Sequence, residues 1–249
     1  MDLGLRGKNA LVTGASRGIG LGIARSLAAE GANVAVSSRS EEAIQAAAAE
    51  VGGRGYVHDS SDLDGAAALV DRVQADVGPL DVLVTNTGGP APAPDSLSIP
   101  RARWTAAYTE LVLAPLSLIE PAAGGMRQRG YGRVVNVSSS SVREPIPGLM
   151  LSSAHRAGML AAFKALAREL AGDGVTVNTL LPGRIATDRI AEIYGSLDDA
   201  ERVAADAIPA GRLGRVEEMG AAAAFLCSEP AGYVTGVSLL VDGGLTQSV

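Results

Sequence analysis

The sequence predicts a single α/β domain in which helices cover both faces of a doubly wound, seven-stranded parallel sheet. Three observations support this fold class. Short apolar or β-branched runs alternate with longer alanine-rich stretches of helical pattern, which is typical of βαβ units. The runs at 82–84 and 134–135 are apolar without alternation, as expected for strands that helices cover on both faces. A glycine-rich turn separates the first strand from the first helix.

The expected elements follow one another without a linker or a repeat of fixed period, so residues 1–249 are expected to form one domain. Strands are expected at 10–13, 33–37, 55–58, 81–85, 133–138, 175–181 and 237–241. Helices are expected at 19–30, 41–51, 62–77, 101–128, 151–170 and 217–227. The proline-rich stretch 89–100 is expected to be a loop, because proline lacks the N–H donor that a helix or a central strand needs. The stretch 184–210 is also taken as a loop.

Composition excludes several classes of protein. With 47% hydrophobic and 19% charged residues the chain is globular, and with 3% aromatic residues its core is built from Ala, Val, Leu and Ile. The net charge is −6 and the basic residues are scattered, which argues against a nucleic-acid partner. Cys227 is the only cysteine, which fits a reducing compartment. We see no signal peptide, no membrane-spanning run and no metal-ligand motif, so a cytoplasmic protein is expected.

The strongest motif is the turn at residues 13–20, with the sequence TGASRGIG. Gly14 suits the tight turn out of the strand, Gly18 lets the backbone approach a pyrophosphate, and Gly20 lets the helix pack closely on the sheet. The free N–H groups at the start of a helix favour phosphate. The turn, with Ser16 and Ile19 inside it, therefore predicts a dinucleotide site. A glycine-rich connection without a ligand is the alternative.

Two arginines favour NADP(H) over NAD(H). Arg39 ends the second strand, where an acidic residue would bind the ribose hydroxyls of NAD(H) and repel a 2′-phosphate. Arg17, inside the glycine turn, provides a second cation for that phosphate. Either arginine alone is also compatible with an ordinary solvated surface.

The G-x3-G-x-G spacing resembles the short-chain dehydrogenase/reductase family, with 3-oxoacyl-carrier-protein reductases the nearest in appearance. The resemblance runs from Lys8 to Gly244 and implies a Rossmann-type sheet. It also implies further cofactor contacts after the third, fourth and sixth strands: Asp59 and Ser60 at the adenine, Asn86 and Gly88, then Pro182, Gly183, Ile185 and Thr187 at the nicotinamide. An N-cap to the next helix is a second role for Thr187, and the two roles are compatible.

The family's catalytic set, Asn, Ser and Tyr-x3-Lys, is largely replaced in this chain. The resemblance places the catalytic Ser at Ser139, with a choice among Ser138–Ser141 left open. Ser152 stands at the Tyr position, Arg156 at the Lys position and Leu111 at the Asn position. A serine hydroxyl is a weaker acid than a phenol, and arginine keeps its proton. Loss of a positioned acid costs about 10²–10⁴-fold in rate, whereas proximity to the cofactor still supplies about 7–11 kcal/mol.

His155 is a candidate substitute acid. Ser152, His155 and Arg156 fall within about 100° of arc on a helix, and histidine titrates near neutral pH. Either His155 or a chain of waters is expected to supply the proton. The alternative is that His155 faces a neighbouring helix or subunit. Glu144, in the preceding loop, either faces the substrate or is a solvated charge.

The leading functional prediction is an atypical NADP(H)-dependent oxidoreductase that reduces a carbonyl, or oxidises an alcohol, of a small or acyl-type substrate. Ser139 and Ser152 would orient the substrate oxygen, and Arg156 would hold the nicotinamide ribose and stabilise negative charge. A non-redox dehydratase, isomerase or cyclase is one alternative, and a non-catalytic NADP(H)-binding subunit is another. The apolar helices at 101–128 and 151–170 predict a homo-oligomer. The segment 237–245 resembles a family interface segment, and this resemblance favours a tetramer.

Overall fold

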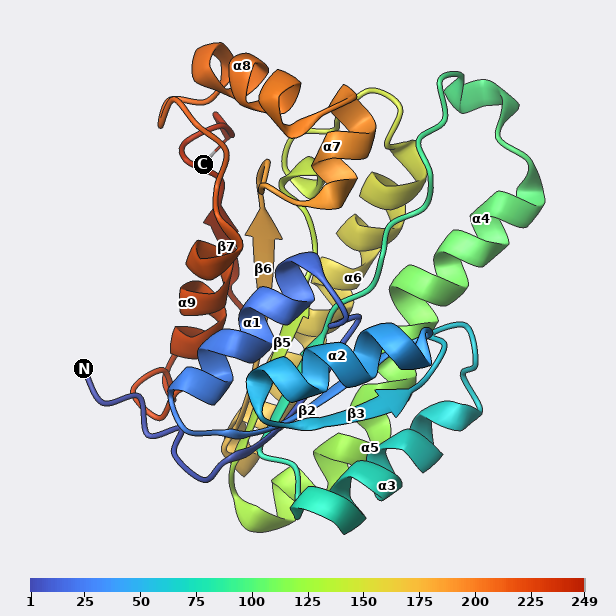
Figure 1. Cartoon of the computed structure of the whole chain (residues 1–249). Coiled ribbons are helices and arrows are strands. Elements are labelled where there is room, and N and C mark those ends of the chain that lie inside the picture. Colours follow the sequence, from blue (N-terminus) through green and yellow to red (C-terminus); the bar gives the residue numbers. More distant parts are fainter. Residues whose placement is uncertain (249) are drawn as a thin grey trace.

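Parallel strands form the central layer of the structure, a computed structural model that describes residues 1–248 (Figure 1). The seven strands lie in the order β3-β2-β1-β4-β5-β6-β7, and every pairing is parallel. This confirms the predicted fold class. The strands are β1 (Asn9–Thr13), β2 (Asn33–Ser38), β3 (Arg54–Val57), β4 (Val82–Thr85), β5 (Gly132–Val137), β6 (Val175–Pro182) and β7 (Ser238–Val241).

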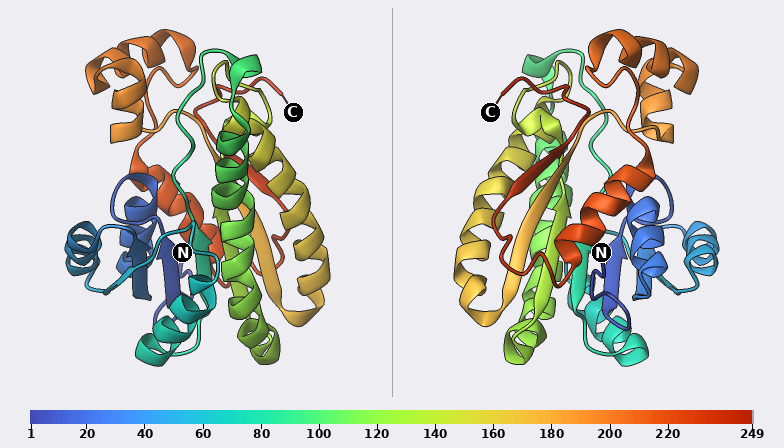
Figure 2. Two further views of the ribbon diagram at one scale, coloured as in Figure 1. Left: turned by 90° about the vertical axis from the view of Figure 1, so that its right-hand side faces the viewer. Right: turned by 90° about the vertical axis from the view of Figure 1, so that its left-hand side faces the viewer.

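Helices cover both faces of the sheet, as Figure 2 shows. Neighbouring strand residues point to opposite faces, so that Val12 packs under α1 and α9 while Leu11 packs under α3 and α5. This two-sided burial explains why the strands are apolar without alternation. The helices are α1 (Gly18–Ala29), α2 (Glu41–Val51), α3 (Gly65–Val77), α4 (Arg101–Tyr108), α5 (Ala114–Arg129), α6 (Met150–Leu170), α7 (Asp188–Tyr194), α8 (Leu197–Ala207) and α9 (Val216–Cys227).

The expectation of a loop at 184–210 was wrong, because this stretch contains α7 and α8. Both helices lie beyond the carboxyl end of β6 (Figure 1). The hydroxyl of Ser196 caps α8 by accepting a hydrogen bond from the Asp199 N–H at 3.0 Å. Ala200 and Ala204 then pack with Ile208 in a small apolar cluster of their own. A serine cap followed by acidic residues and spaced alanines is a helix signal that the sequence analysis passed over.

The predicted helix at 101–128 is interrupted by a π-helical segment, η2 (Thr109–Leu113), between α4 and α5. Leu111, which stands at the family's Asn position, lies in this segment and is 3% exposed. The family's polar side chain is thus replaced here by an apolar one buried in the core. The π segment nonetheless keeps the local widening of the helix that often accompanies a functional site.

Cys227, at the end of α9, is fully buried in the core on the α1 side of the sheet. Burial raises the pKa of its thiol to about 12. Within residues 1–248, no helix combines the length and the apolar character that a membrane crossing requires.

Candidate active site

The glycine turn after β1 has the geometry that its residues predict. Gly14 and Gly18 have φ values of 57° and 59°, which favour glycine. A Cβ at Gly14 would lie 2.3 Å from the backbone oxygen of Asn86. A Cβ at Gly20 would lie 2.4 Å from the backbone oxygen of Gly14. The turn is therefore packed so closely that only glycine fits at these positions.

The start of α1 offers an anion site. Arg17 occupies the N-cap position without a capping side-chain hydrogen bond, and the first turn holds no acidic residue. Ser16 and Ile19 are half-buried in the same turn. A Cβ at Gly18 would meet only the side chain of Thr187, at 3.5 and 3.9 Å, so the backbone there is open to a close approach. The free N–H groups and the helix dipole fit the pyrophosphate of a dinucleotide.

Asn86 joins the ends of β1 and β4, the two strands between which the sheet order reverses direction. Its side-chain amide donates to the Gly14 oxygen at 2.9 Å, and its backbone N–H donates to the Thr13 hydroxyl at 3.0 Å. Beyond it, a Cβ at Gly88 would meet nothing within 4 Å. Sheets of this kind bind ligands at such a switch point.

The end of β2 carries the groups expected at the adenosine. Arg39 is exposed there, and Asp59 follows β3. Asp59 accepts hydrogen bonds from the backbone and the hydroxyl of Ser61, both at 2.9 Å. These bonds hold the pKa of Asp59 below its usual value, and the charge of Arg39 lowers it further. Ser60, which lies between Asp59 and Ser61 in the sequence, is half-buried.

Arg17 was expected to be a second cation available to the 2′-phosphate. In the structure it forms an ion pair with Asp188 of α7 at 3.0 Å. Both side chains are about two-thirds exposed, at 70% and 68%. Such a pair contributes about 0.2–1 kcal/mol, which is small enough for a bound phosphate to displace it. Arg17 therefore links the phosphate turn to α7.

The segment after β6 lies over the phosphate turn. Thr187 occupies the N-cap position of α7, but its hydroxyl donates to the Ile185 oxygen at 3.3 Å and makes no capping bond. Ile185 pairs with Gly214 in an isolated bridge. Pro182 ends β6, and a Cβ at Gly183 would lie 2.6 Å from the Cβ of Asp242. Gly183 is thus required where this segment crosses the chain after β7.

Arg156 and Ser152 form a buried pair near the carboxyl ends of β4 and β5. The Arg156 Nε donates to the Ser152 hydroxyl at 3.2 Å, and Nη1 donates to the Val137 oxygen at 2.7 Å. Nη2 lies 3.5 Å from the Thr87 oxygen. Burial, with a smaller contribution from Arg189, lowers the pKa of Arg156 to about 10. The guanidinium of Arg156, a residue that is 8% exposed, therefore stays charged at neutral pH.

Four serines follow β5, and their burial separates them. Ser139 is half-buried, whereas Ser138, Ser140 and Ser141 are buried. The Ser139 hydroxyl accepts a hydrogen bond from the Ser141 N–H at 3.1 Å. Ser139 is thus the serine of this group with the most accessible side chain, in line with the register that the sequence favours.

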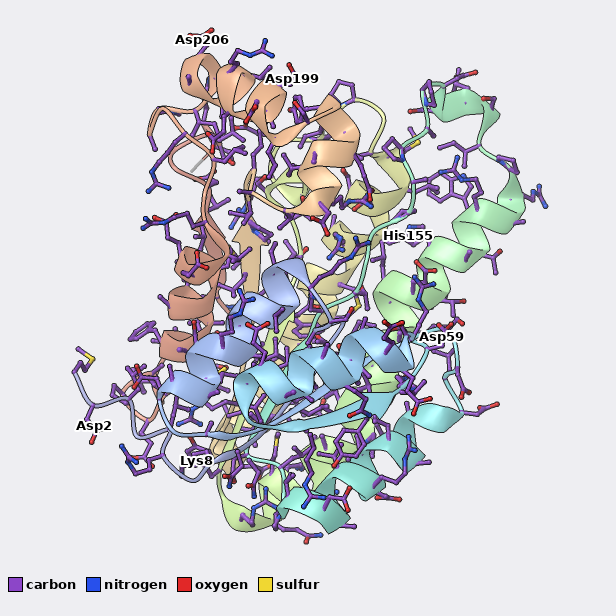
Figure 3. All side chains as sticks on the ribbon, viewed as in Figure 1. Asp2, Lys8, Asp59, His155, Asp199 and Asp206 are labelled. Carbon is purple, nitrogen blue, oxygen red and sulfur yellow. The ribbon has the colours of Figure 1, made fainter. Side chains whose placement is uncertain are left out.

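His155 is directed toward α4 and not toward Ser152. Its ring lies 5.5 Å from the Trp104 ring and 6.1 Å from the Tyr108 ring, and Figure 3 shows it between α6 and α4. Its Nδ1 is 2.7 Å from the Leu151 oxygen, one turn back in the same helix. Within the described residues, no hydrogen bond joins His155 to the Ser152–Arg156 pair. The sequence placed His155 on the same helix surface as Ser152 and Arg156. In the structure the imidazole instead packs against the aromatic side chains of α4.

Glu144, which is half-buried, is hydrogen-bonded to the C-terminal segment. Its Oε1 accepts hydrogen bonds from the backbone N–H groups of Gln247 and Ser248, at 2.6 and 2.7 Å. The loop after Ser139 is thereby joined to the C-terminal segment.

Arg189 is a site residue that the sequence analysis missed. It lies in the first turn of α7, and its two terminal nitrogens donate to the oxygens of Gly89 and Pro90 at 3.3 and 3.0 Å. It therefore connects α7 to the loop after β4. Arg189 follows Thr187, an expected cofactor contact, by two residues, and this nearness was the signal in the sequence that could have marked Arg189 as a site residue. Among the residues that the structure describes, no cluster of three or more His, Cys, Asp or Glu side chains is arranged to hold a metal ion.

Comparison with known proteins gives consistent matches over nearly the whole chain. A family model described as enoyl-(acyl carrier protein) reductase matches residues 14–246. The acetoacetyl-CoA reductase of Shinella zoogloeoides is 38% identical, with 94% of this chain and 97% of that protein covered. The 3-oxoacyl-[acyl-carrier-protein] reductase FabG of Haemophilus influenzae is 35% identical, with 98% and 100% covered.

Among solved structures, YwfH, described as an NADPH-dependent reductase involved in bacilysin biosynthesis, superposes with a TM-score of 0.91. It is 32% identical, and 97% of this chain and 99% of that chain are covered. The sheet order, the glycine turn at its switch point and these matches agree with one another. This chain belongs to the short-chain dehydrogenase/reductase family of oxidoreductases.

Proposed function

We propose that this protein is an NADPH-dependent carbonyl reductase in which the Ser152–Arg156 pair does the work of the family's Tyr-x3-Lys. The observation that carries the proposal is the charged, buried guanidinium of Arg156, hydrogen-bonded to Ser152 and Val137 near the carboxyl ends of β4 and β5. The acetoacetyl-CoA and 3-oxoacyl reductases among the relatives support carbonyl reduction. The NADPH-dependent relative supports the cofactor.

A bound nicotinamide supplies the hydride that such a reduction needs. In our proposal, the hydroxyls of Ser139 and Ser152 donate hydrogen bonds to the substrate carbonyl oxygen and fix its orientation. Arg156 contacts the ribose and stabilises the negative charge that develops on that oxygen. Because arginine keeps its proton, the proton that completes the alcohol comes from a chain of waters that begins at the two hydroxyls and regains a proton from solvent.

The test is a panel of ketones and aldehydes offered to the purified protein with NADPH, with the loss of NADPH absorbance as the readout. We expect at least one carbonyl compound to be reduced, with one alcohol formed for each NADPH consumed. Tight NADPH binding without consumption of any carbonyl compound would contradict the proposal. It would favour a non-redox enzyme or a cofactor-binding subunit.

We expect NADPH to bind at least about tenfold more tightly than NADH, which corresponds to about 1.4 kcal/mol. The exposed Arg39 is free to contact a 2′-phosphate, and Arg17 can exchange Asp188 for it. Fluorescence titration measures both dissociation constants. Arg39→Asp should remove the preference, whereas Arg168→Asp, in the last turn of α6, should keep it. Equal constants in the unmodified protein would refute this expectation.

We expect a homotetramer, with a mass of four times the 25.2 kDa of one chain. Apolar surface is left exposed on one side of the molecule by Phe225 of α9, by Val237 just before β7 and by Leu239 of β7. Light scattering at micromolar concentration measures the mass. Leu239→Arg should lower it by placing a charge in the contact, and a monomeric mass for the unmodified protein would contradict the proposal.

His155→Gln should leave turnover close to that of the unmodified protein. The His155 ring contacts Trp104 and Tyr108, and its Nδ1 is engaged by its own helix. Removal of a positioned acid lowers the rate about 10²–10⁴-fold. The value of kcat and its pH profile therefore show whether His155 is the proton donor or only a packing residue. A loss of that size with unchanged NADPH affinity would restore His155 as the proton donor and remove the water from the mechanism.

A further inference from the structure

Two guanidinium groups lie near Ser152, and within residues 1–248 neither has a carboxylate partner. Arg156 is bonded to Ser152 and to backbone oxygens. Arg189 is bonded to the oxygens of Gly89 and Pro90. The two cations are close enough for Arg189 to contribute to the lowered pKa of Arg156, although burial is the larger cause. Arg156 is buried whereas Arg189 is exposed, and a buried cation without a counter-ion is costly unless an anion approaches it.

Two acidic side chains of the adjoining segments are engaged elsewhere, and Glu192 of α7, which is exposed, forms no ion pair with Arg189 within residues 1–248. Asp188 pairs with Arg17 at 3.0 Å, and Glu144 accepts hydrogen bonds from the C-terminal segment. The chain as a whole carries a net charge of −6, so two neighbouring cations without carboxylate partners stand out against the negative charge of the whole protein. This local excess of positive charge attracts an anion to the space beside Ser152.

Gly89 lies beside both Arg189 and Ser152. A Cβ at Gly89 would lie 3.3 Å from the Arg189 Nη2 and 3.9 Å from the Ser152 hydroxyl oxygen. Both donors therefore face the same small space. Each terminal nitrogen of a guanidinium carries two N–H groups, so the bonds to Gly89 and Pro90 leave donors of Arg189 for a ligand. Arginine pairs well with carboxylates, and often in a bidentate manner.

We infer that the substrate is a short oxo acid, whose carboxylate binds Arg189 while its carbonyl oxygen lies at Ser152. This inference rests on the proposed carbonyl reduction. The shared space at Gly89 limits the separation of the two groups, so the carbonyl lies on the carbon next to the carboxylate or one carbon further. Arg189 thus selects the substrate, and Arg156 acts on the carbonyl oxygen and the cofactor.

The test compares pyruvate with methyl pyruvate and acetoacetate with methyl acetoacetate, because each pair differs in the negative charge. The unmodified protein should show a kcat/KM at least about tenfold higher for each acid than for its ester. Arg189→Met should lower kcat/KM for the acids by about 10- to 100-fold, mainly through KM, and should lower kcat/KM for the esters far less. Arg168→Met, which removes a cation from the last turn of α6, should change neither.

A second measurement reads the carboxylate site without turnover. The protein–NADPH complex is titrated by calorimetry with β-hydroxybutyrate and with its methyl ester, and the acid should bind at least about tenfold more tightly. Gly89→Ala, whose methyl group occupies the shared space, should remove this difference without the loss of the Arg189 charge.

The outcomes separate the two proposals. If esters and acids are reduced equally well, or if Arg189→Met affects both alike, the oxo-acid inference is overturned and carbonyl reduction stands. If no carbonyl compound is reduced but the acid still binds more tightly through Arg189, the carboxylate site stands and the reductase proposal fails.

Discussion

Gly20→Ala is expected to weaken NADPH binding by about 30- to 150-fold, the result of about 2–3 kcal/mol of misfit in the turn. Alanine is the better helix former, so propensity alone predicts a gain in stability. The structure reverses that sign, because the new Cβ would lie 2.4 Å from the Gly14 oxygen and 2.7 Å from the Asn86 amide. Neither backbone nor a hydrogen-bonded amide moves easily, so the phosphate turn would shift away from α1.

Gly124→Ala is the matched control. Gly124 is exposed in α5, and a Cβ there would meet nothing within 4 Å. This variant should gain about 0.5–1 kcal/mol in the free energy of unfolding and bind NADPH normally. Fluorescence titration and urea unfolding measure the two quantities. NADPH binding by Gly20→Ala that equals that of the unmodified protein would show that the turn adapts to a side chain.

Arg156→Ala is expected to lower kcat by about 10²–10³-fold, the usual loss when a donor to a developing oxyanion is removed. It should also raise the dissociation constant of NADPH, since the same side chain is proposed to contact the ribose. The variant should remain folded, because the buried charge that it removes was itself costly. Its loss leaves the oxygens of Val137 and Thr87 without this donor, which costs about 1–3 kcal/mol for each that stays dry.

Single-turnover kinetics separate the chemical step from cofactor binding in this variant. Arg156→Lys keeps the charge but loses the forked guanidinium that reaches Ser152 and Val137 together. Its kcat should therefore lie between that of the unmodified protein and that of Arg156→Ala. The double variant Ser152→Tyr with Arg156→Lys restores the family pair. If that double variant reduces ketones while the unmodified protein reduces none, the non-redox alternative replaces our proposal.

The sheet and the phosphate turn were predictable because their signals are local. Val12 and Leu11 are apolar neighbours that face opposite sides of β1. A short run of such residues is typical of a strand that is buried on both faces. Gly14 and Gly20 stand at positions where backbone atoms meet, and no other residue type satisfies that requirement. The strand order and the site at the carboxyl ends then follow from the connectivity of parallel strands.

The directions of individual side chains were not predictable. Helical spacing places His155 and Ser152 within one arc, but the aromatic side chains of α4, far away in the sequence, decide which way the imidazole turns. Arg189 gains its role only when α7 reaches the loop after β4. Glu144 likewise meets partners more than 100 residues away in the chain. These contacts depend on tertiary packing, which a pattern along one segment does not contain.

The burial of Cys227 makes the chain's only thiol a reporter of motion. Thiol reagents attack the thiolate, which burial suppresses by raising the pKa to about 12. Alkylation therefore proceeds only when α9 separates from the sheet, and its rate measures the free energy of that local opening. For the same reason, a cysteine introduced on the surface, for example on α7, would react alone with a fluorescent label. The motion of the helix that carries Arg189 can thus be followed in solution without removal of the natural cysteine.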